Sequence, residues 1–185
     1  MSEAKTTTHV DSFPHRHSIR LQGYDYSNAG FYFVTLVTQG RLPLLGHIAD
    51  GEMCLSDLGN QVQETLLQIN KRYECVSLVE HVVMPNHLHL ILHLEKGENG
   101  KQSCPLSTVM RDFKSLTNHS YTQKEGKPYS RLWQRNYYEH IIRNERAYDY
   151  ICSYIRENPR RWQYDKMNKL CDQHADEIMR NVLTL

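Results

Sequence analysis

Two histidines, His87 and His89, are the first residues whose type and spacing suggest metal chemistry. They begin a segment, residues 87–94, in which every second residue is leucine, as in a strand with one apolar face. Alternate side chains of a strand share a face, so both imidazoles lie opposite the leucines, about 6.6 Å apart along the strand. At that spacing they can converge on one divalent cation, whereas His93 lies too far along. The spacing is equally that of two ordinary histidines on a polar sheet face.

A second group with reactive chemistry lies on a predicted helix over residues 145–157. Tyr154 and Asn158 are four residues apart, so their side chains share one face of this helix. A phenol oxygen can attack phosphorus and hold a cut strand as a covalent phosphodiester, and an amide oxygen one turn on can complete a metal's ligand set. Tyrosines on amphipathic helices more often lie at the edge of a core. Tyr150 shares the face and is the alternative nucleophile, whereas Tyr148 lies on another face.

The elements that must position these residues alternate between strands and helices. Strands are predicted over 31–38, 75–83 and 87–94 and within 133–142, and helices over 56–72, 105–121 and 145–157. Residues 39–52 are rich in glycine and proline and are predicted to form a loop or a hairpin. The order β, α, β, β, α, β, α predicts an α+β sandwich, with helices packed on one face of a mainly antiparallel sheet.

The composition limits the partners that the chain can take. It has 22 Lys and Arg residues against 21 Asp and Glu residues, so blanket attraction to nucleic acid is not expected and any anion site must be local. No stretch approaches the roughly 20 apolar residues of a membrane helix, and residues 1–20 lack the apolar core of a secretory signal, so no membrane partner is expected. Five cysteines without a CxxC pair disfavour disulfides and structural zinc and indicate a cytoplasmic location.

Three motifs together resemble one family of enzymes. Residues 84–90 (MPNHLHL), 133–144 (WQRNYYEHIIRN) and 154–159 (YIRENP) are similar to motifs of the HUH single-tyrosine transposases. Within that family they are most similar to the REP-associated tyrosine transposases. Residues 16–26 are also similar to that group, and the resemblance covers roughly residues 15–162.

The resemblance implies a complete active site and a reaction. Tyr154 would be the nucleophile, and His87, His89 and Asn158 would be the protein ligands of Mg²⁺ or Mn²⁺. The family fold is a ferredoxin-like sandwich, in agreement with the predicted order of elements. The implied activity is that of a metal-dependent endonuclease and strand transferase. It would act on single-stranded DNA beside hairpins, through a 5′-phosphotyrosine intermediate, in the bacterial cytosol or nucleoid. The sequence leaves open whether the protein is a homodimer.

The chain is predicted to divide into a polar arm (1–22), a catalytic domain (23–162) and a partly helical tail (163–185) whose role is open. Binding of a single strand needs a cationic groove and aromatic platforms. The candidate cations for contacts with the DNA backbone are Arg16, Arg20, Arg111, Lys114, Arg135, Arg143, Arg160 and Arg161. Trp133 and Trp162 lie among these cations in the sequence, but we expect both in the core.

Two other functions fit part of the pattern. A replication-initiator or relaxase-like nickase uses the same chemistry, but such proteins often carry a helicase domain, for which 185 residues leave no room. A non-catalytic single-stranded nucleic-acid-binding sheet, similar to RNA-recognition modules, would present aromatic side chains where this strand presents His87 and His89. Loss of divalent-metal binding in the His87→Ala and His89→Ala variants would distinguish an enzyme from such a binding module.

Overall fold

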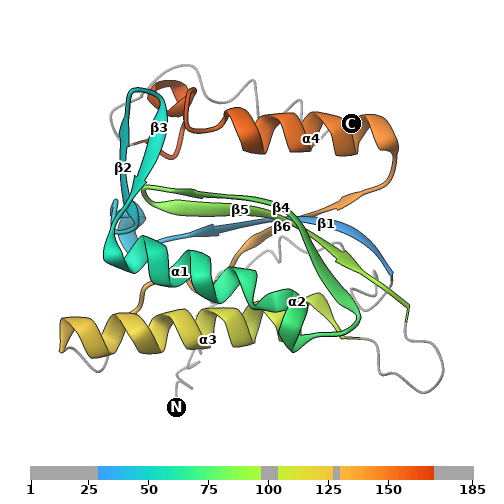
Figure 1. Cartoon of the computed structure of the whole chain (residues 1–185), viewed down its shortest axis with the longest axis horizontal. Helices are drawn as coiled ribbons and strands as arrows, with labels where there is room; N and C mark the ends of the chain where they lie inside the picture. Colours follow the sequence, from blue (N-terminus) through green and yellow to red (C-terminus); the bar gives the residue numbers. More distant parts are fainter. Residues whose placement is uncertain (1–28, 97–103, 127–129, 169–185) are drawn as a thin grey trace, which may run out of the picture.

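The centre of the protein is a four-stranded antiparallel sheet with the strand order β4–β5–β1–β6 (Figure 1). The computed structural model describes residues 29–96, 104–126 and 130–168. The strands of the sheet are β1 (Gly30–Val37), β4 (Val76–Met84), β5 (His87–Leu94) and β6 (Tyr138–Ile142). The helices are α1 (Asp57–Leu67), α2 (Ile69–Arg72), α3 (Leu106–Glu125) and α4 (Glu145–Glu157).

Two crossover connections build this sheet. Helices α1 and α2 connect β1 to β4, and α3 connects β5 to β6. Each crossover joins two strands that have one antiparallel strand between them: β5 lies between β1 and β4, and β1 lies between β5 and β6. This is the βαββαβ arrangement of a ferredoxin-like fold, so the predicted fold class is confirmed.

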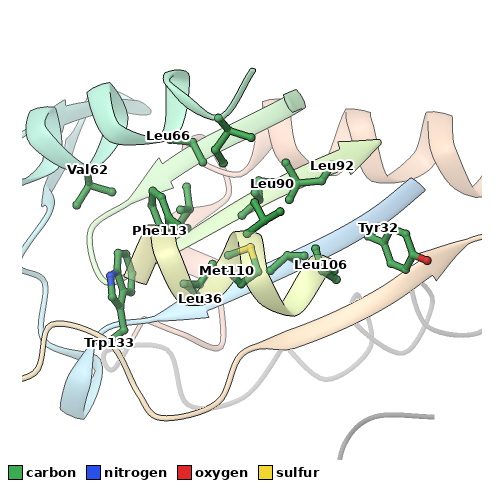
Figure 2. Packing of buried hydrophobic residues seen from close by; sticks show 14 of the residues in the cluster. Tyr32, Leu36, Val62, Leu66, Leu90, Leu92, Leu106, Met110, Phe113 and Trp133 are labelled. Carbon is green, nitrogen blue, oxygen red and sulfur yellow. The ribbon is translucent and has the colours of Figure 1, made fainter. Parts of the chain in front are cut away.

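The larger core lies between the sheet and the helices α1 to α3. The leucines of β5 at positions 88, 90, 92 and 94 point into it, as predicted, and Leu36 of β1 lies beside them. Figure 2 shows Leu66 of α1 and Met110 and Phe113 of α3 covering these strand residues. Full burial of one leucine side chain contributes about 1.5–3 kcal/mol, so this row of leucines alone holds the helices firmly on the sheet.

Helix α4 lies on the opposite face of the sheet from α1, α2 and α3 (Figure 1). The prediction that the helices pack on one face is therefore correct for the crossover helices and wrong for α4. The reason is a second, smaller apolar cluster: Phe33 of β1 and Ile91 of β5 point away from the leucines and contact Ile151 and Ile155 of α4. Burial of this cluster holds α4 against the face that also carries His87 and His89.

Local sequence signals explain where two of the helices begin. The Ser56 hydroxyl accepts a hydrogen bond from the Gly59 amide at 3.0 Å and caps α1. The Asn144 side chain accepts one from the Ala147 amide at 2.8 Å and caps α4. The segment predicted as a loop or hairpin contains a hairpin of β2 (Gly46–Ala49) and β3 (Glu52–Leu55).

Beyond α4, the chain folds back toward the beginning of β5. A short 3-10 helix, η2 (Trp162–Tyr164), follows, and Met167 is buried with its carbonyl accepting a hydrogen bond from Asn86 Nδ2 at 2.8 Å. The packed structure thus continues to residue 168, six residues beyond the predicted boundary of the catalytic domain. The polar arm 1–22 and the predicted helix near the C-terminus lie outside the described residues. None of the helices in the described ranges has the length and apolar character needed to cross a membrane.

Candidate active site between β5 and α4

The two histidines of the HxH motif do converge. His87 pairs with Val37 and His89 with Thr35 in the antiparallel register of β5 and β1, so both imidazoles project toward α4. Their ring centroids are 4.5 Å apart. His93 is separate from this pair, because its ring stacks on Phe31 with a centroid distance of 4.3 Å.

The orientation of His87 is set by its sequence neighbour, Asn86. The Asn86 Nδ2 group donates to the carbonyls of Arg41 at 3.2 Å and Met167 at 2.8 Å. Its Oδ1 atom therefore faces His87 Nδ1 at 2.9 Å and must accept the proton of that nitrogen. This leaves His87 Nε2 deprotonated, with a lone pair that points into the space under α4.

His89 is held in an equivalent way by β1. Its Nδ1 atom lies 2.7 Å from the Thr35 hydroxyl oxygen, and its Nε2 atom lies 3.3 Å from the Tyr154 hydroxyl oxygen. With Nδ1 directed at Thr35, His89 Nε2 faces the same space as His87 Nε2. A hydrogen bond to the second ring nitrogen is the usual way in which a protein fixes the tautomer of a metal-binding histidine.

Two buried polar atoms at this site have no hydrogen-bond partner: His87 Nε2 and Asn158 Oδ1. The exposed fractions of His87, His89 and Asn158 are 0%, 1% and 2%. A buried acceptor without a partner costs about 1–3 kcal/mol, so such atoms are retained where they have another use. Amide oxygen suits Mg²⁺ and Mn²⁺, and imidazole nitrogen suits transition-metal ions, so this mixed set of residues fits a divalent cation. Within the described ranges no group of three His, Cys, Asp or Glu side chains is arranged to hold a metal ion, so an ion here would depend on the amide.

Burial keeps both imidazoles in the form that binds metals. It lowers the pKa of His87 to about 4, although the nearby Asp165 carboxylate acts in the opposite direction. Burial, together with the neighbouring His87 ring, holds the pKa of His89 well below its usual value. Both rings are therefore neutral at pH 7, as metal coordination requires.

Among the helix tyrosines, Tyr154 is the one that faces the histidines. Its ring centroid lies 5.3 Å from that of His89, and its hydroxyl group forms a hydrogen bond with the side-chain amide of Asn158. Burial and the charge of Asp165 raise the pKa of the phenol, and the Asn158 hydrogen bond lowers it by less. The resting group is thus a neutral phenol. Tyr148 instead contacts Phe31, with ring centroids 5.3 Å apart.

Sequence reasoning misses one residue beside His87, Asp165, and misplaces another, Trp162. Asp165 Oδ2 lies 3.8 Å from His87 Nε2, and its side chain is only 8% exposed. The Trp162 ring lies 6.0 Å from the His87 ring and is half-buried, so the expectation that it belongs to the core is wrong. The expectation is correct for Trp133, which is buried and donates through Nε1 to the Thr117 hydroxyl oxygen at 2.8 Å. No spacing in the sequence connects residues 162–165 to His87, because only the turn after α4 brings them together.

The predicted DNA-contact residues do not form one surface. Arg160 and Arg161 follow the C-terminal end of α4, and Arg161 pairs with Glu157 at 3.3 Å. Arg143 precedes α4 and lines a separate pocket with Phe31 and Tyr148. The remaining predicted DNA-contact residues that the structure describes lie on or beside α3: Arg111, Lys114 and Arg135. Arg16 and Arg20 lie outside the described residues.

Comparison with known proteins identifies the class of protein that has this fold. The family model described as "Transposase IS200 like" matches residues 52–158, a range that contains His87, His89, Tyr154 and Asn158. The chain therefore belongs to the IS200-like transposase family, which confirms the resemblance inferred from its motifs.

Individual relatives agree with this assignment. The chain is 37% identical to an uncharacterized protein of Haemophilus influenzae over 178 residues, which are 88% of this chain and 98% of that protein. It is 32% identical to a REP-associated tyrosine transposase of Escherichia coli over 78 residues, which are 42% of this chain and 41% of that protein. A solved REP-associated tyrosine transposase bound to a REP hairpin has the same fold, with a TM-score of 0.58 at 22% identity over 80% of this chain and 76% of that one.

Proposed function

We propose that the protein is a metal-dependent endonuclease and strand transferase that acts on single-stranded DNA through a 5′-phosphotyrosine intermediate. The observation that supports this proposal is the meeting of three potential ligand atoms beside one phenol. His87 Nε2, His89 Nε2 and Asn158 Oδ1 are buried together, and the Tyr154 hydroxyl lies 3.3 Å from one of them.

The proposed ligands of Mg²⁺ or Mn²⁺ are His87, His89 and Asn158. A divalent cation bound there would polarise a non-bridging oxygen of the scissile phosphate and neutralise the charge that develops on it. Two imidazoles and one amide would leave further coordination positions of such an ion for phosphate and water. Asn86 keeps the ring proton of His87 on Nδ1, so that its Nε2 lone pair stays available, and the Thr35 hydroxyl fixes the orientation of the His89 ring.

Tyr154 is the proposed nucleophile. Its oxygen attacks the phosphorus, the phenol proton is lost, the bond to the 3′ oxygen breaks, and that oxygen takes up a proton. The products are a 5′-phosphotyrosine and a free 3′-hydroxyl group. Attack on the phosphotyrosine by a different 3′-hydroxyl reverses these steps and joins the strand to a new end. The phenol is held for attack by α4, whose apolar stripe packs on Phe33 and Ile91.

The proposed substrate is single-stranded DNA beside a hairpin in the bacterial cytosol or nucleoid. Arg160 and Arg161, which follow Asn158 directly, are proposed to contact the backbone of the strand that enters the site. The proposed catalytic domain comprises residues 23–162 together with the segment up to residue 168, since Asp165 and Met167 pack at the site.

The decisive experiment is a trapping assay with labelled single-stranded oligonucleotides that carry a hairpin, in the presence of Mn²⁺. We expect a covalent protein–DNA adduct that resists denaturation and is absent when EDTA is added. The Tyr154→Phe variant should bind the same DNA without forming the adduct. Binding without any adduct in the parent protein would instead indicate a non-catalytic single-stranded DNA-binding protein.

A further inference from the structure

The carboxylate of Asp165 lies beside the candidate metal site but is not among the proposed ligands. Asp165 directly follows η2, and its side chain is only 8% exposed. Its Oδ2 atom is 3.8 Å from His87 Nε2, which is one of the proposed ligand atoms. Burial removes water that stabilises a carboxylate, so a buried carboxylate is normally paired with a positive charge or a metal ion. The position of Asp165 therefore indicates a cationic partner.

His87 itself is not that partner. Its ring carries one proton, on Nδ1, which Asn86 Oδ1 accepts at 2.9 Å. Burial keeps the ring neutral at pH 7 by lowering its pKa to about 4. His87 Nε2 is thus a buried lone pair without a hydrogen-bond partner, and it faces a carboxylate oxygen. Two acceptors in this arrangement repel each other, and a positive charge beside them turns the repulsion into attraction.

A ring of contacts holds Asp165 in this position. Its Oδ1 atom accepts a hydrogen bond from the Met167 amide at 2.7 Å, and the Met167 carbonyl accepts one from Asn86 Nδ2 at 2.8 Å. Asn86 also orients His87, so the ring of contacts returns to the imidazole that Asp165 faces. The Asp165 amide donates to the Trp162 carbonyl at 3.1 Å. The carboxylate is therefore positioned through the same residue that orients the proposed ligand.

The proposed ligands carry no charge of their own. His87 and His89 are neutral at pH 7, and Asn158 contributes an amide. A divalent cation held only by buried neutral groups would keep both of its charges uncompensated, which is costly. The charge of Asp165 reaches both sides of the site, because it acts against the lowering of the His87 pKa and raises the pKa of the Tyr154 phenol. Asp165 is thus placed to offset part of the charge of such an ion.

We propose that Asp165 is the counter-charge of the metal site, and that its carboxylate strengthens the binding of the divalent cation that His87, His89 and Asn158 would hold. The inference rests on the proposed function, to which it adds an acidic residue from outside the three motifs. Asp165 acts here without being a ligand. Within the described ranges it does not form a three-residue metal site with the two histidines, and Coulomb attraction extends over several ångströms in a buried site.

The test uses Asp165→Asn, which removes the charge but keeps the shape and the Oδ1 acceptor for the Met167 amide. The matched control is Glu157→Gln, which also removes one negative charge, from an exposed side chain next to Asn158. Mn²⁺ affinity is measured by calorimetry, and the free energy of unfolding is measured by urea denaturation in EDTA. Together the two measurements separate an effect of charge on the metal from a structural role.

We expect Asp165→Asn to bind Mn²⁺ roughly 10–100-fold more weakly than the control, as is typical when a group that supports a metal ligand is lost. Without metal, Asp165→Asn should be at least as stable as the control. The reason is that its amide nitrogen can donate to His87 Nε2, where the carboxylate presents a second acceptor.

Equal Mn²⁺ affinity of the two variants would overturn the counter-charge proposal. A lower free energy of unfolding for Asp165→Asn in EDTA would also overturn it, because a structural role would then explain any loss of metal binding. In both cases the proposed function stands if the parent protein binds Mn²⁺ and forms the covalent adduct. A parent protein that binds no Mn²⁺ and forms no adduct would overturn both proposals.

Discussion

At the scale of single residues, the candidate site contains two kinds of group. Some atoms are proposed to bind the metal, and other groups only orient the residues that carry those atoms. The Thr35 hydroxyl contacts His89 Nδ1 and no ligand position, and both residues are buried. Loss of such an orienting hydrogen bond typically weakens metal affinity 10–100-fold. This predicts that groups in β1, far from Tyr154 in sequence, determine how well the site binds its cation.

The first prediction concerns Thr35→Val, which removes this hydroxyl with little change in volume. We expect Mn²⁺ affinity, measured by calorimetry, to fall roughly 10–100-fold. The matched control is Thr117→Val, because Thr117 is equally buried and hydrogen-bonds Trp133 on the other face of the sheet. Both variants should lose about 1 kcal/mol of unfolding free energy, but only Thr35→Val should lose metal affinity. Equal Mn²⁺ binding by the two variants would contradict the proposed role of His89.

The second prediction separates the two tyrosines that share a face of α4. Tyr154→Phe should retain Mn²⁺ and DNA binding and lose both cleavage and the covalent adduct, because the attacking oxygen is gone. Tyr150→Phe removes the same atom one turn earlier and should remain active. Peptide mass spectrometry of the trapped adduct provides the check: a nucleotide on Tyr150 in place of Tyr154 would show that the assignment is wrong.

The third prediction concerns the stability of the metal-free protein. The pKa of His87 falls from 6.5 to about 4 on folding, so the unfolded chain takes up a proton that the folded chain refuses. The stability associated with the neutral His87 ring is fully present above pH 6.5. As the pH falls from 6.5 toward 4, this residue alone lowers the free energy of unfolding by about 3 kcal/mol. Urea denaturation in EDTA should show this slope, and His87→Gln should reduce it to the part that His89 contributes, since burial lowers the pKa of His89 as well. His47→Gln, which removes an exposed histidine of β2, is the control and should retain the slope.

At the scale of elements, α4 is attached through a small apolar cluster, whereas α1 and α3 share the large core. The fourth prediction is that Ile155→Ala impairs catalysis beyond its effect on stability, because it loosens the helix that carries Tyr154 and Asn158. Leu66→Ala is the control, since it removes a similar volume from an equally buried position on the other face. Each should cost about 2–5 kcal/mol of unfolding free energy. Single-turnover cleavage below the unfolding transition should be slower only for Ile155→Ala, with faster hydrogen exchange confined to α4.

Sequence periodicity was sufficient to predict most elements and the convergence of His87 and His89. Alternation in β5 places the leucines on one face and His87 and His89 on the other, because strand geometry allows no other arrangement. The four-residue spacing of Tyr154 and Asn158 is equally direct on a helix. The predicted helix over residues 145–157 matches α4 at both ends, where Asn144 and the Asn158-Pro159 pair supply the boundary signals.

Long-range packing could not be predicted in this way. Nothing in the local pattern tells on which face α4 packs, since that depends on Phe33 and Ile91 meeting its apolar stripe. The approach of Asp165 and Trp162 to His87 likewise depends on the turn after α4. The arginines between positions 131 and 161 suggest one cluster in sequence, but the sheet edge and α4 distribute them over separate surfaces.

At the scale of the whole molecule, a formal net charge of +1 conceals an uneven distribution. Cations gather beside α3 and after α4, while the ligand atoms between them are buried and uncharged. Any attraction to DNA is therefore expected to be local. The candidate active site lies under a helix, so we expect that a strand must leave its partner before its phosphate can approach Tyr154.

The last prediction follows from this enclosure: the protein should cut a flank only while that flank is single-stranded. The phosphate must reach the Tyr154 hydroxyl, which lies between α4 and β5 and 3.3 Å from His89 Nε2, and a rigid duplex cannot place one of its phosphates there. The two substrates should be the same hairpin with its flank either free or annealed to a complementary strand, both with Mn²⁺. Because misplacement of the reacting atoms by about 1 Å can cost roughly a hundredfold in rate, annealing should reduce cleavage by at least that factor. Unpairing of a few bases at the cut position should restore it. Comparable cleavage of both strands of the perfect duplex would contradict the enclosed site described here.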